Sequence, residues 1–462
     1  MSQKFRTEKD SMGEMQVPAS AYYAAQTQRA VENFPISTLK FTEPMIKAMG
    51  LVKRSAAVVN NQLGVLDDAM KDAIVAAAEE VESGKLNDHF VVDIFQTGSG
   101  TSSNMNVNEV VANRAKEMSG GEIKVHPNDH VNASQSSNDT IPTEIHIATA
   151  REINDELIPG LKVFAESLGK KAEEYKDLVK TGRTHLQDAT PVTLGQEFGG
   201  YKAQIEQGVR RLERSLETIY ELPLGGTAVG TGLNTPLGFA DKVIKEIASR
   251  SGLPFVEASN HFEAQSAKDA LVEMSGQLKT IATSVIKIAN DIRLLGTGPR
   301  CGLGEISLPA VQPGSSIMPG KINPVICESA IMVGCQVIGN DAAVTTAGHV
   351  GSTFELNVAM PVIAHNILES ISLLANTARN MATKCVDGIT ANPERLHELA
   401  EANISTVTAL VPIIGYDKSA EIAKTAWKTG EPLRAVALRE SGLPEDELNK
   451  ALDLVKMTKP GL

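Results

Sequence analysis

The sequence is poor in aromatic residues, cysteine and long apolar runs, and each shortage excludes a class of protein. Aromatic residues make up 4% of the 462 positions, with a single tryptophan. Alanine, leucine, glutamate and lysine are plentiful instead, which favours helix over sheet. The four cysteines have no C-x-x-C spacing, so we expect buried thiols rather than a disulfide scaffold. No uninterrupted apolar run approaches the roughly 18 residues of a membrane span.

Basic residues are also in deficit, and they do not gather into a block. Lysine plus arginine total 44 against 56 acidic residues, which gives a formal net charge of −12. Nucleic acid is therefore not expected as a partner. The N-terminal segment 1–10 is polar and charged, without the apolar core of a signal peptide. We expect a soluble, cytoplasmic protein with no membrane partner.

Regular apolar spacing predicts one long helix between residues 260 and 297. Apolar residues recur there at alternating intervals of three and four, the spacing of a coiled-coil seam: Leu271, Met274, Leu278, Ile281, Val285, Ile288, Ile292 and Leu295. At about 1.5 Å per residue this helix is on the order of 50 Å long, so long neighbouring helices must flank it. Other long helical patterns cover 140–178, 192–221, 324–345 and 353–386. These patterns predict a mainly all-α protein with a central bundle of long helices.

Breaks in the helical pattern divide the chain into three predicted domains. The segment His126–Asn138 is polar and loop-like, and Asp387–Pro393 is a cluster of turn-forming residues. We place an N-terminal, mainly helical domain at 1–135, the helical bundle at 136–390 and a small helical domain at 391–462.

Four polar clusters interrupt the apolar helical pattern, and each stands at the expected start of a helix. They are Gln96–Asn104, Ser136–Asp139, Thr181–Pro191 and Gly314–Pro324. Glycine in the first cluster would let backbone N–H groups approach a ligand, but no lysine follows as in a Walker loop. N-capping explains the second cluster as well, and we prefer that interpretation for Asp139. Together the four clusters predict one composite site.

The fourth cluster has the composition of an anion-binding loop. The hydroxyls of Ser315 and Ser316 and the ammonium of Lys321 lie in it. Asn323 is a good N-cap and the proline after it suits the first helical position, so the positive end of a helix dipole should face the loop. A carboxylate would find cationic, amide and backbone N–H donors there. Glu328 follows one turn into the helix, where it could equally be a surface charge.

The histidines carry weaker signals. His185 is a lone imidazole in the third cluster, and such a residue is more often structural than catalytic. His126 and His130 are four apart, as in a helical metal site, but Pro127 and Asn128 argue against a helix there. We predict no metal ion, and a polar loop with solvated histidines is the simpler interpretation of this segment.

The order of these clusters resembles that of the class II fumarases, the iron-free hydratases of the fumarase and aspartase superfamily. The resemblance covers nearly the whole chain, from the A-Q-T-Q-R element at Ala25–Arg29 to Gly415–Lys418. It implies a three-domain fold whose long helices form the core of a homotetramer, with active sites shared between subunits. It also implies reversible hydration of fumarate to (S)-malate, a tricarboxylic acid cycle reaction, by anti addition through an aci-carboxylate, with no cofactor.

The resemblance also implies roles for individual residues. Ser315 would remove the carbon-bound proton, and His185, oriented by Glu328, would protonate the departing hydroxyl or activate water. From the residues alone the reverse assignment, with His185 as the carbon base, stays open. The substrate carboxylates would be held by Ser99, Gly100, Thr101, Ser136, Ser137, Asn138, Thr184, Ser316, Lys321 and Asn323. A second dicarboxylate site would be formed by His126, Asn128 and Asp129.

Two alternative functions share parts of this pattern. Aspartate ammonia-lyases of the superfamily typically have Gln at the position of His185 and Ala at that of Gly320, and their first cluster usually reads G-A-G-T. Here it reads T-G-S-G-T. A non-catalytic helical scaffold, like the superfamily's lens proteins, would need none of the four clusters. Tyr23 and Ala24 replace the Trp-Gly of many fumarases, but they lie outside the motifs. We therefore expect water to be the group added.

Overall fold

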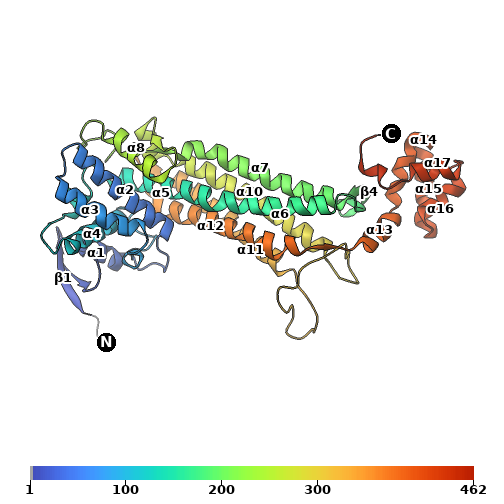
Figure 1. Cartoon of the computed structure of the whole chain (residues 1–462), viewed down its shortest axis with the longest axis horizontal. Helices are drawn as coiled ribbons and strands as arrows, with labels where there is room; N and C mark the ends of the chain where they lie inside the picture. The colour runs from blue at the N-terminus through green and yellow to red at the C-terminus, as the bar shows by residue number, and fades with distance from the viewer. Residues whose placement is uncertain (1–3, 462) are drawn as a thin grey trace. The chain divides into compact units, whose positions relative to one another are not determined.

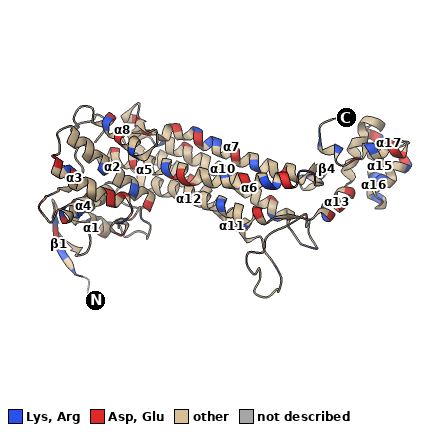
Figure 2. Ribbon diagram, viewed as in Figure 1, with Lys and Arg blue, Asp and Glu red and all other residues tan. Residues whose placement is uncertain are grey.

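The computed structural model describes residues 4–461. Residues 1–3, at the start of the predicted polar N-terminal segment, and Leu462, at the end of the predicted C-terminal domain, lie outside the described residues. The described part forms seventeen α-helices and ten short strands, which pair in five two-stranded sheets (Figure 1). Basic and acidic residues are interspersed along the helices (Figure 2). Within residues 4–461 no helix is long and apolar enough to cross a membrane. The predicted mainly all-α fold is confirmed.

The chain divides into two compact units. Unit 1 comprises 1–159, 208–282 and 333–375, and unit 2 comprises 160–207, 283–332 and 376–462. All the boundaries fall inside long helices, which are α6 (Ile158–Glu174), α7 (Leu194–Ile219), α10 (Asp269–Leu295), α11 (Val325–Val350) and α12 (Met360–Lys384). The three-domain division made from the sequence stays a prediction.

Unit 1 is organised around the long helix α2 (Glu43–Gln62). Pro44 lies in the first turn of α2, where its fixed φ favours helix and its missing N–H would have had no helical acceptor. The other elements of unit 1 are β1 (Phe5–Asp10), β2 (Gly13–Pro18), α1 (Ala25–Asn33), α3 (Asp68–Glu82), α4 (Thr101–Met118), α5 (Ser137–Glu152), β5 (Glu221–Leu222), α8 (Phe239–Ser251), β6 (Val256–Glu257), α9 (His261–Ser266), β8 (Ser352–Thr353) and β9 (Leu356–Asn357). Helix α2 packs against α3, α5 and α8.

Unit 2 contains the C-terminal helices. Its elements besides the long helices are β3 (Val179–Thr184), β4 (Gln187–Thr193), β7 (Ile306–Ser307), β10 (Thr390–Ala391), α13 (Pro393–Glu401), α14 (Val411–Ile414), α15 (Tyr416–Thr429), α16 (Leu433–Glu440) and α17 (Glu445–Ala451). The last helices enclose an apolar core of their own, formed by Leu410, Ile422, Ala426, Leu433, Val436, Ala437, Leu448 and Leu452. Helices this short are marginal alone, so burial of these side chains stabilises the segment.

The apolar seam predicted between 260 and 297 is buried, with all eight of its residues at most 6% exposed. Hydrogen bonds join α10 to its neighbours: Tyr201 of α7 donates to Asp291 over 3.1 Å, and Ser275 donates to Asp341 of α11 over 2.9 Å. The prediction of one unbroken helix is wrong, because extended backbone at Ala267 separates α9 from α10. The other predicted long helices are present, the first of them as α5 and α6 joined by a π-helical segment, Ile153–Leu157.

Candidate active site

The first two polar clusters meet in unit 1 through a chain of hydroxyl groups. Helix α4 begins at Thr101 and helix α5 at Ser137, as predicted. The Oγ1 atom of Thr101 lies 2.9 Å from Oγ of Ser99 and 2.7 Å from Oγ of Ser137, both within hydrogen-bond distance. Three hydroxyls of the predicted carboxylate-binding set therefore lie together at two helix N-termini, where anions bind favourably.

Packing requires glycine at two positions of the first cluster. A Cβ atom at Gly98 would lie 1.8 Å from the carbonyl oxygen of Val358. Gly100 precedes α4 with a φ of 74°, and a Cβ there would lie 2.9 Å from carbons of Ile141. Only glycine fits both positions. This steric requirement adds to the predicted approach of a ligand, which stays a prediction.

The second cluster caps helix α5 as expected for Asp139. The hydroxyl of Ser136 accepts from the N–H of Asn138 over 3.2 Å, and the N–H of Ser136 donates to the Asp139 carboxylate over 2.9 Å. The same carboxylate accepts from the N–H groups of Gly225 (3.0 Å) and Thr227 (2.9 Å). Asp139 is fully buried, and this burial raises its pKa. Its three backbone donors offset that cost and fix the start of α5.

The third cluster is a β-hairpin, so the prediction that it begins a helix is wrong. Strands β3 and β4 pair antiparallel, and His185 and Leu186 form the two-residue turn between them. Their φ values are 56° and 60°. A type I′ turn requires this sign at both central residues, a conformation uncommon for residues other than glycine, asparagine and aspartate. The turn leaves His185 and Thr184 exposed.

A buried ionic cluster anchors this hairpin to the segment that precedes the serine loop. Glu305, fully buried beside β7, lies 2.8 Å from the guanidinium of Arg183 and 3.3 Å from the ammonium of Lys180. Lys180 also pairs with Glu197 over 2.9 Å, and the Glu197 side chain is 27% exposed. Nothing local in the sequence marks this cluster, because the cationic partners of Glu305 lie more than a hundred residues earlier.

Replacing Glu305 with Gln should destabilise the fold strongly. The change would leave the buried ammonium of Lys180 and the guanidinium of Arg183 without a shared counter-charge, which costs about 3–5 kcal/mol in comparable buried pairs. Glu197→Gln is the matched control and should cost less, because that side chain is partly exposed and faces one cation only. Denaturant midpoints of the two variants measure the difference, and a Glu305→Gln midpoint equal to wild type would contradict the role assigned to the cluster.

The fourth cluster is a loop that closes on itself in unit 2. The N–H of Gly314 donates to the carbonyl of Lys321 over 2.9 Å, and the side-chain amide of Asn323 donates to the carbonyl of Gly314 over 2.6 Å. Inside this loop the hydroxyl oxygen of Ser315 accepts from the N–H groups of Ile317 (3.3 Å) and Met318 (3.0 Å). Two N–H dipoles therefore point at one hydroxyl oxygen, an arrangement that favours negative charge on that oxygen.

Helix α11 starts slightly later than predicted. It begins at Val325, so Pro324 precedes it, and the Asn323 amide closes the loop instead of serving as the predicted N-cap. Lys321, Ser316 and Glu328 are exposed around the start of the helix. Within residues 4–461 of one chain, no hydrogen bond or ion pair joins Glu328 to the imidazole that it was predicted to orient.

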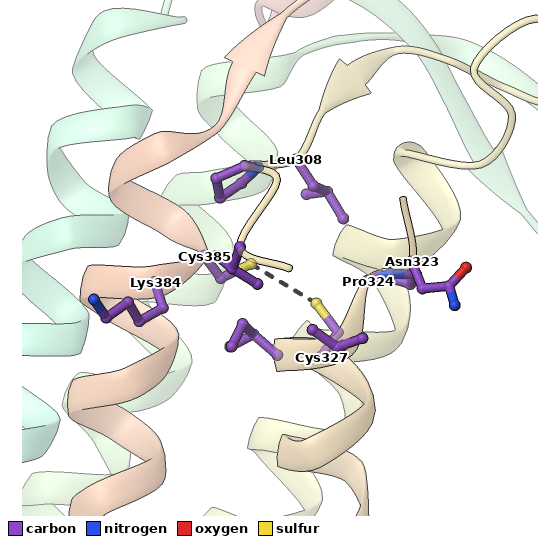
Figure 3. A pocket seen from close by; sticks show the side chains of 10 residues that line it. Leu308, Asn323, Pro324, Cys327, Lys384 and Cys385 are labelled. Atoms are coloured by element: carbon purple, nitrogen blue, oxygen red, sulfur yellow. Dashed lines mark hydrogen bonds between the residues drawn. The ribbon is translucent and has the colours of Figure 1, made fainter. Parts of the chain in front are cut away.

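A small cavity lies beside the first turn of α11 (Figure 3). Asn323 and Pro324 line it, and the sulfur atoms of Cys327 and Cys385 lie 3.8 Å apart at its wall. Its volume of about 10 Å³ has room for about one water molecule, so it cannot admit a dicarboxylate. Both of these thiols are buried, as predicted. Cys301 and Cys335 are exposed, which corrects the expectation that all four thiols are buried.

The predicted second site borders a larger cavity in unit 1. This cavity has a volume of about 540 Å³ and is lined by His126, Asn128 and neighbouring residues of the N-terminal hairpin, but Asp129 is not among its lining residues. Pro127 and Asn128 argue against a helix that carries both histidines, and the segment forms a single π-helical turn, Pro127–Val131, which His126 precedes with extended backbone. The ring nitrogens Nδ1 of His126 and His130 accept from backbone N–H groups at 3.1 and 2.9 Å. In the described chain no group of three His, Cys, Asp or Glu side chains is placed to hold a metal ion.

Comparison with known proteins decides the family. One family model, described as Lyase, matches residues 13–339, and another, described as Fumarase C C-terminus, matches residues 407–459. Fumarate hydratase class II of Corynebacterium glutamicum is 55% identical over 461 residues, which covers 98% of this chain and 97% of that protein. The chain belongs to the class II fumarase family. Mitochondrial fumarate hydratase of Homo sapiens is 53% identical over 452 residues, covering 96% of this chain and 88% of that protein.

Solved structures agree with this assignment. The crystal structure of recombinant class II fumarase from Schistosoma mansoni matches with a TM-score of 0.96 at 39% identity, covering 98% of this chain and 99% of that one. The predicted fumarase and aspartase fold and the family resemblance are therefore confirmed. As a member of the class II fumarases, the chain is a lyase.

Proposed function

We propose that this class II fumarase catalyses the reversible hydration of fumarate to (S)-malate by anti addition of water. The observation that carries the proposal is the environment of Ser315, whose hydroxyl oxygen accepts two backbone N–H groups within a closed loop. The names of the relatives at 53% and 55% identity support the choice of substrate.

In the dehydration direction the first step removes a proton from the malate carbon next to a carboxylate. Ser315 takes this proton as an alkoxide, and the electron pair of the C–H bond moves onto the carboxylate to give the aci-carboxylate. The two N–H donors and the ammonium of Lys321 stabilise the alkoxide. Lys321, Asn323 and the N-terminus of α11 stabilise the aci-carboxylate, and a single such donor is worth about 3–4 kcal/mol in comparable oxyanion sites.

The second step expels the hydroxyl group from the neighbouring carbon. His185, protonated and oriented by Glu328, gives its proton to the departing hydroxide, so water leaves as the carbon–carbon double bond forms. Because no hydrogen bond or ion pair joins His185 to Glu328 within the described residues of one chain, we assign the two residues of one site to different copies of the chain. The exposed turn that carries His185 is suited to reach a neighbouring subunit.

A homotetramer is part of the proposal, and the outward face of α11 supports it. Six of the eleven residues of this helix that are exposed in the single chain are small or apolar, namely Met332, Cys335, Ile338, Gly339, Ala342 and Val350, and the other five are Glu328, Gln336, Thr345, Thr346 and His349. Met332 is 66% exposed and Val350 71%. A helix with apolar residues on two opposite faces is stable when each face packs against other protein elements. Other copies of the chain would provide this packing for the exposed face of α11.

Hybrid tetramers of Ser315→Ala and His185→Asn chains should therefore regain activity. Each variant alone lacks one group at every site, whereas in random hybrids about a quarter of the sites receive both groups from chains that retain them. Co-expression of differently tagged chains, followed by an assay of the hybrid, measures the recovery. Activity no higher than that of the separate variants would mean that one chain supplies both groups to one site.

Neutral donors hold the substrate carboxylates in this proposal. Ser99, Gly100, Thr101, Ser136, Ser137, Asn138, Thr184 and Ser316 supply hydroxyl, amide and backbone N–H groups. The overall field of a chain with a net charge of −12 does not attract a dianion, so local donors must bind the substrate carboxylates.

We further propose that His126, Asn128 and Asp129 bind a second dicarboxylate beside the 540 Å³ cavity. The expected independence from metal and the cytoplasmic location also belong to this proposal.

Nuclear magnetic resonance of the reaction in D₂O tests the proposed function. Anti addition should give malate with one deuterium at a single position of its methylene carbon. A mixture of both diastereomers would contradict anti addition. Absence of malate would contradict the activity itself.

A further inference from the structure

Lys53 is a lysine buried in the middle of helix α2. Its side chain is 0% exposed, and its ammonium donates to side-chain oxygens of Asn104 (2.7 Å), Gln135 (3.0 Å) and Asn132 (3.3 Å). A lysine is almost never fully buried without a specific set of partners. The three acceptors belong to two segments of the chain that Lys53 itself does not belong to.

Two of the three acceptors lie beside predicted carboxylate-binding groups, and the third links those two. Asn104 is in the first turn of α4, which Thr101 opens, and Gln135 immediately precedes Ser136, the N-cap of α5. Asn132 links the two segments, because its side-chain oxygen accepts from the Asn104 amide and its own amide donates to the backbone of Gln135, both over 3.1 Å. The Lys53 ammonium thus links the starts of α4 and α5, where the hydroxyl oxygens of Thr101 and Ser137 lie 2.7 Å apart.

Charge gives Lys53 a second connection to helix α5. Asp139 and Glu144 of that helix are both fully buried, and among the described residues neither carboxylate oxygen of Glu144 accepts a hydrogen bond. Burial raises the pKa of Glu144 to about 8 and lowers the pKa of Lys53 to about 8, while the attraction between them opposes both shifts. Lys53 is therefore the cation that faces the buried acidic groups of α5.

We propose that Lys53 is a positioning residue for dicarboxylate binding, whose ammonium fixes the N-terminal turns of α4 and α5 relative to each other. It touches no substrate. It acts through Asn104, Asn132 and Gln135 on the hydroxyls of Ser99, Thr101 and Ser137. The inference rests on the proposed function, since it assigns these hydroxyls to the substrate carboxylates.

The position of Lys53 decides which kinetic constant it affects. The hydroxyls that it arranges bind carboxylate in substrate and in transition state alike, and the proton-transfer groups Ser315 and His185 lie in unit 2. Loss of such uniform binding raises KM without lowering kcat. A role in overall stability alone would change neither constant at a temperature where the protein is folded.

Lys53→Met should raise both the KM for fumarate and the inhibition constant of succinate, an unreactive dicarboxylate. We expect a rise of about 10- to 100-fold in each, with kcat within about threefold of wild type, as for the loss of well-placed hydrogen bonds. Lys268→Met is the matched control. Lys268 is 2% exposed in the same unit, but its acceptors among the described residues are the backbone carbonyls of Ala264, Gln265 and Ala267. That variant should melt at a lower temperature with KM unchanged.

Unchanged KM and succinate inhibition in Lys53→Met would overturn the positioning role, as would an equal rise in Lys268→Met. Gln135→Leu serves where Lys53→Met does not fold, because it removes one acceptor from a half-buried position; we expect about a 3- to 10-fold rise in KM. Calorimetric titration of succinate separates the two proposals. A wild type that binds succinate but does not hydrate fumarate would defeat the proposed function, and the positioning role would then be judged by whether Lys53→Met weakens that binding.

Discussion

Ser315→Ala should lower turnover by about 10³- to 10⁴-fold, the size of a lost general base. The alanine methyl group cannot take a proton, and no other hydroxyl in the loop accepts the N–H groups of Ile317 and Met318. Exchange of the malate methylene hydrogen with D₂O should stop in this variant, because that exchange needs the carbon base alone. Turnover and exchange are measured in the same resonance experiment.

Ser316→Ala is the matched control for this prediction. Ser316 is the neighbouring exposed hydroxyl, and we assign it to carboxylate binding, so its loss should raise KM and leave hydrogen exchange in place. Persistent exchange in Ser315→Ala would transfer the carbon-base role to another residue. His185 is the first candidate, since the residues alone left that assignment open.

His185→Asn should lower kcat by about 10²- to 10⁴-fold while hydrogen exchange at carbon continues. Asparagine is the suitable replacement, because it tolerates the φ of 56° at the hairpin turn better than most residues. With Ser315 intact the aci-carboxylate still forms and returns, but the hydroxide has no proton donor. Rates of hydrogen exchange and of ¹⁸O exchange at the malate hydroxyl measure the two steps separately.

Leu186→Asn tests the turn itself. It places the same side chain at the neighbouring position, where φ is 60°, and it should keep most of the activity. Near-normal turnover in His185→Asn would remove the imidazole from the mechanism. Loss of hydrogen and oxygen exchange together would instead favour His185 as the carbon base.

Local patterns predicted the parts of this fold that depend on local forces. The three-and-four spacing from Leu271 to Leu295 predicted α10 and its burial, because a long helix keeps one face buried along its whole length. The interruption at Ala267 was not predicted. At this interruption the ammonium of Lys268 donates to backbone carbonyls of Ala264, Gln265 and Ala267, and apolar spacing carries no information about such bonds.

The hairpin that carries His185 could not be predicted from its turn. Two-residue hairpins are usually marked by Asn-Gly or a similar pair, whereas this one has His-Leu. Distant contacts hold it instead: the side-chain amide of Asn403 donates to the carbonyl of Ala189 over 2.7 Å, and Ser405 donates to that of Asp188 over 2.9 Å. Partners more than two hundred residues away leave no mark near the turn.

The polar groups of the candidate site could be predicted from the sequence, but the distant residues that position them could be predicted only in part. Polar clusters in a helical chain predicted a shared site that includes the hydroxyls of Thr101 and Ser137, and the oxygen atoms of these hydroxyls lie 2.7 Å apart. The steric need for Gly98 arises from the backbone of Val358, far along the chain. Lys53 gave no signal, because one lysine in a helix is ordinarily a surface residue. The proposed role of Lys53 follows from the three side-chain acceptors of its ammonium, which come from other segments of the chain.

Loss of the ultraviolet absorbance of fumarate shows directly whether this chain hydrates fumarate without a metal. Purified protein is assayed in a strong chelator, with and without ammonium. The expected result is rapid loss of absorbance without ammonium, with malate as the product. Loss that occurs only when ammonium is present, with aspartate as the product, or no loss at all, would contradict it.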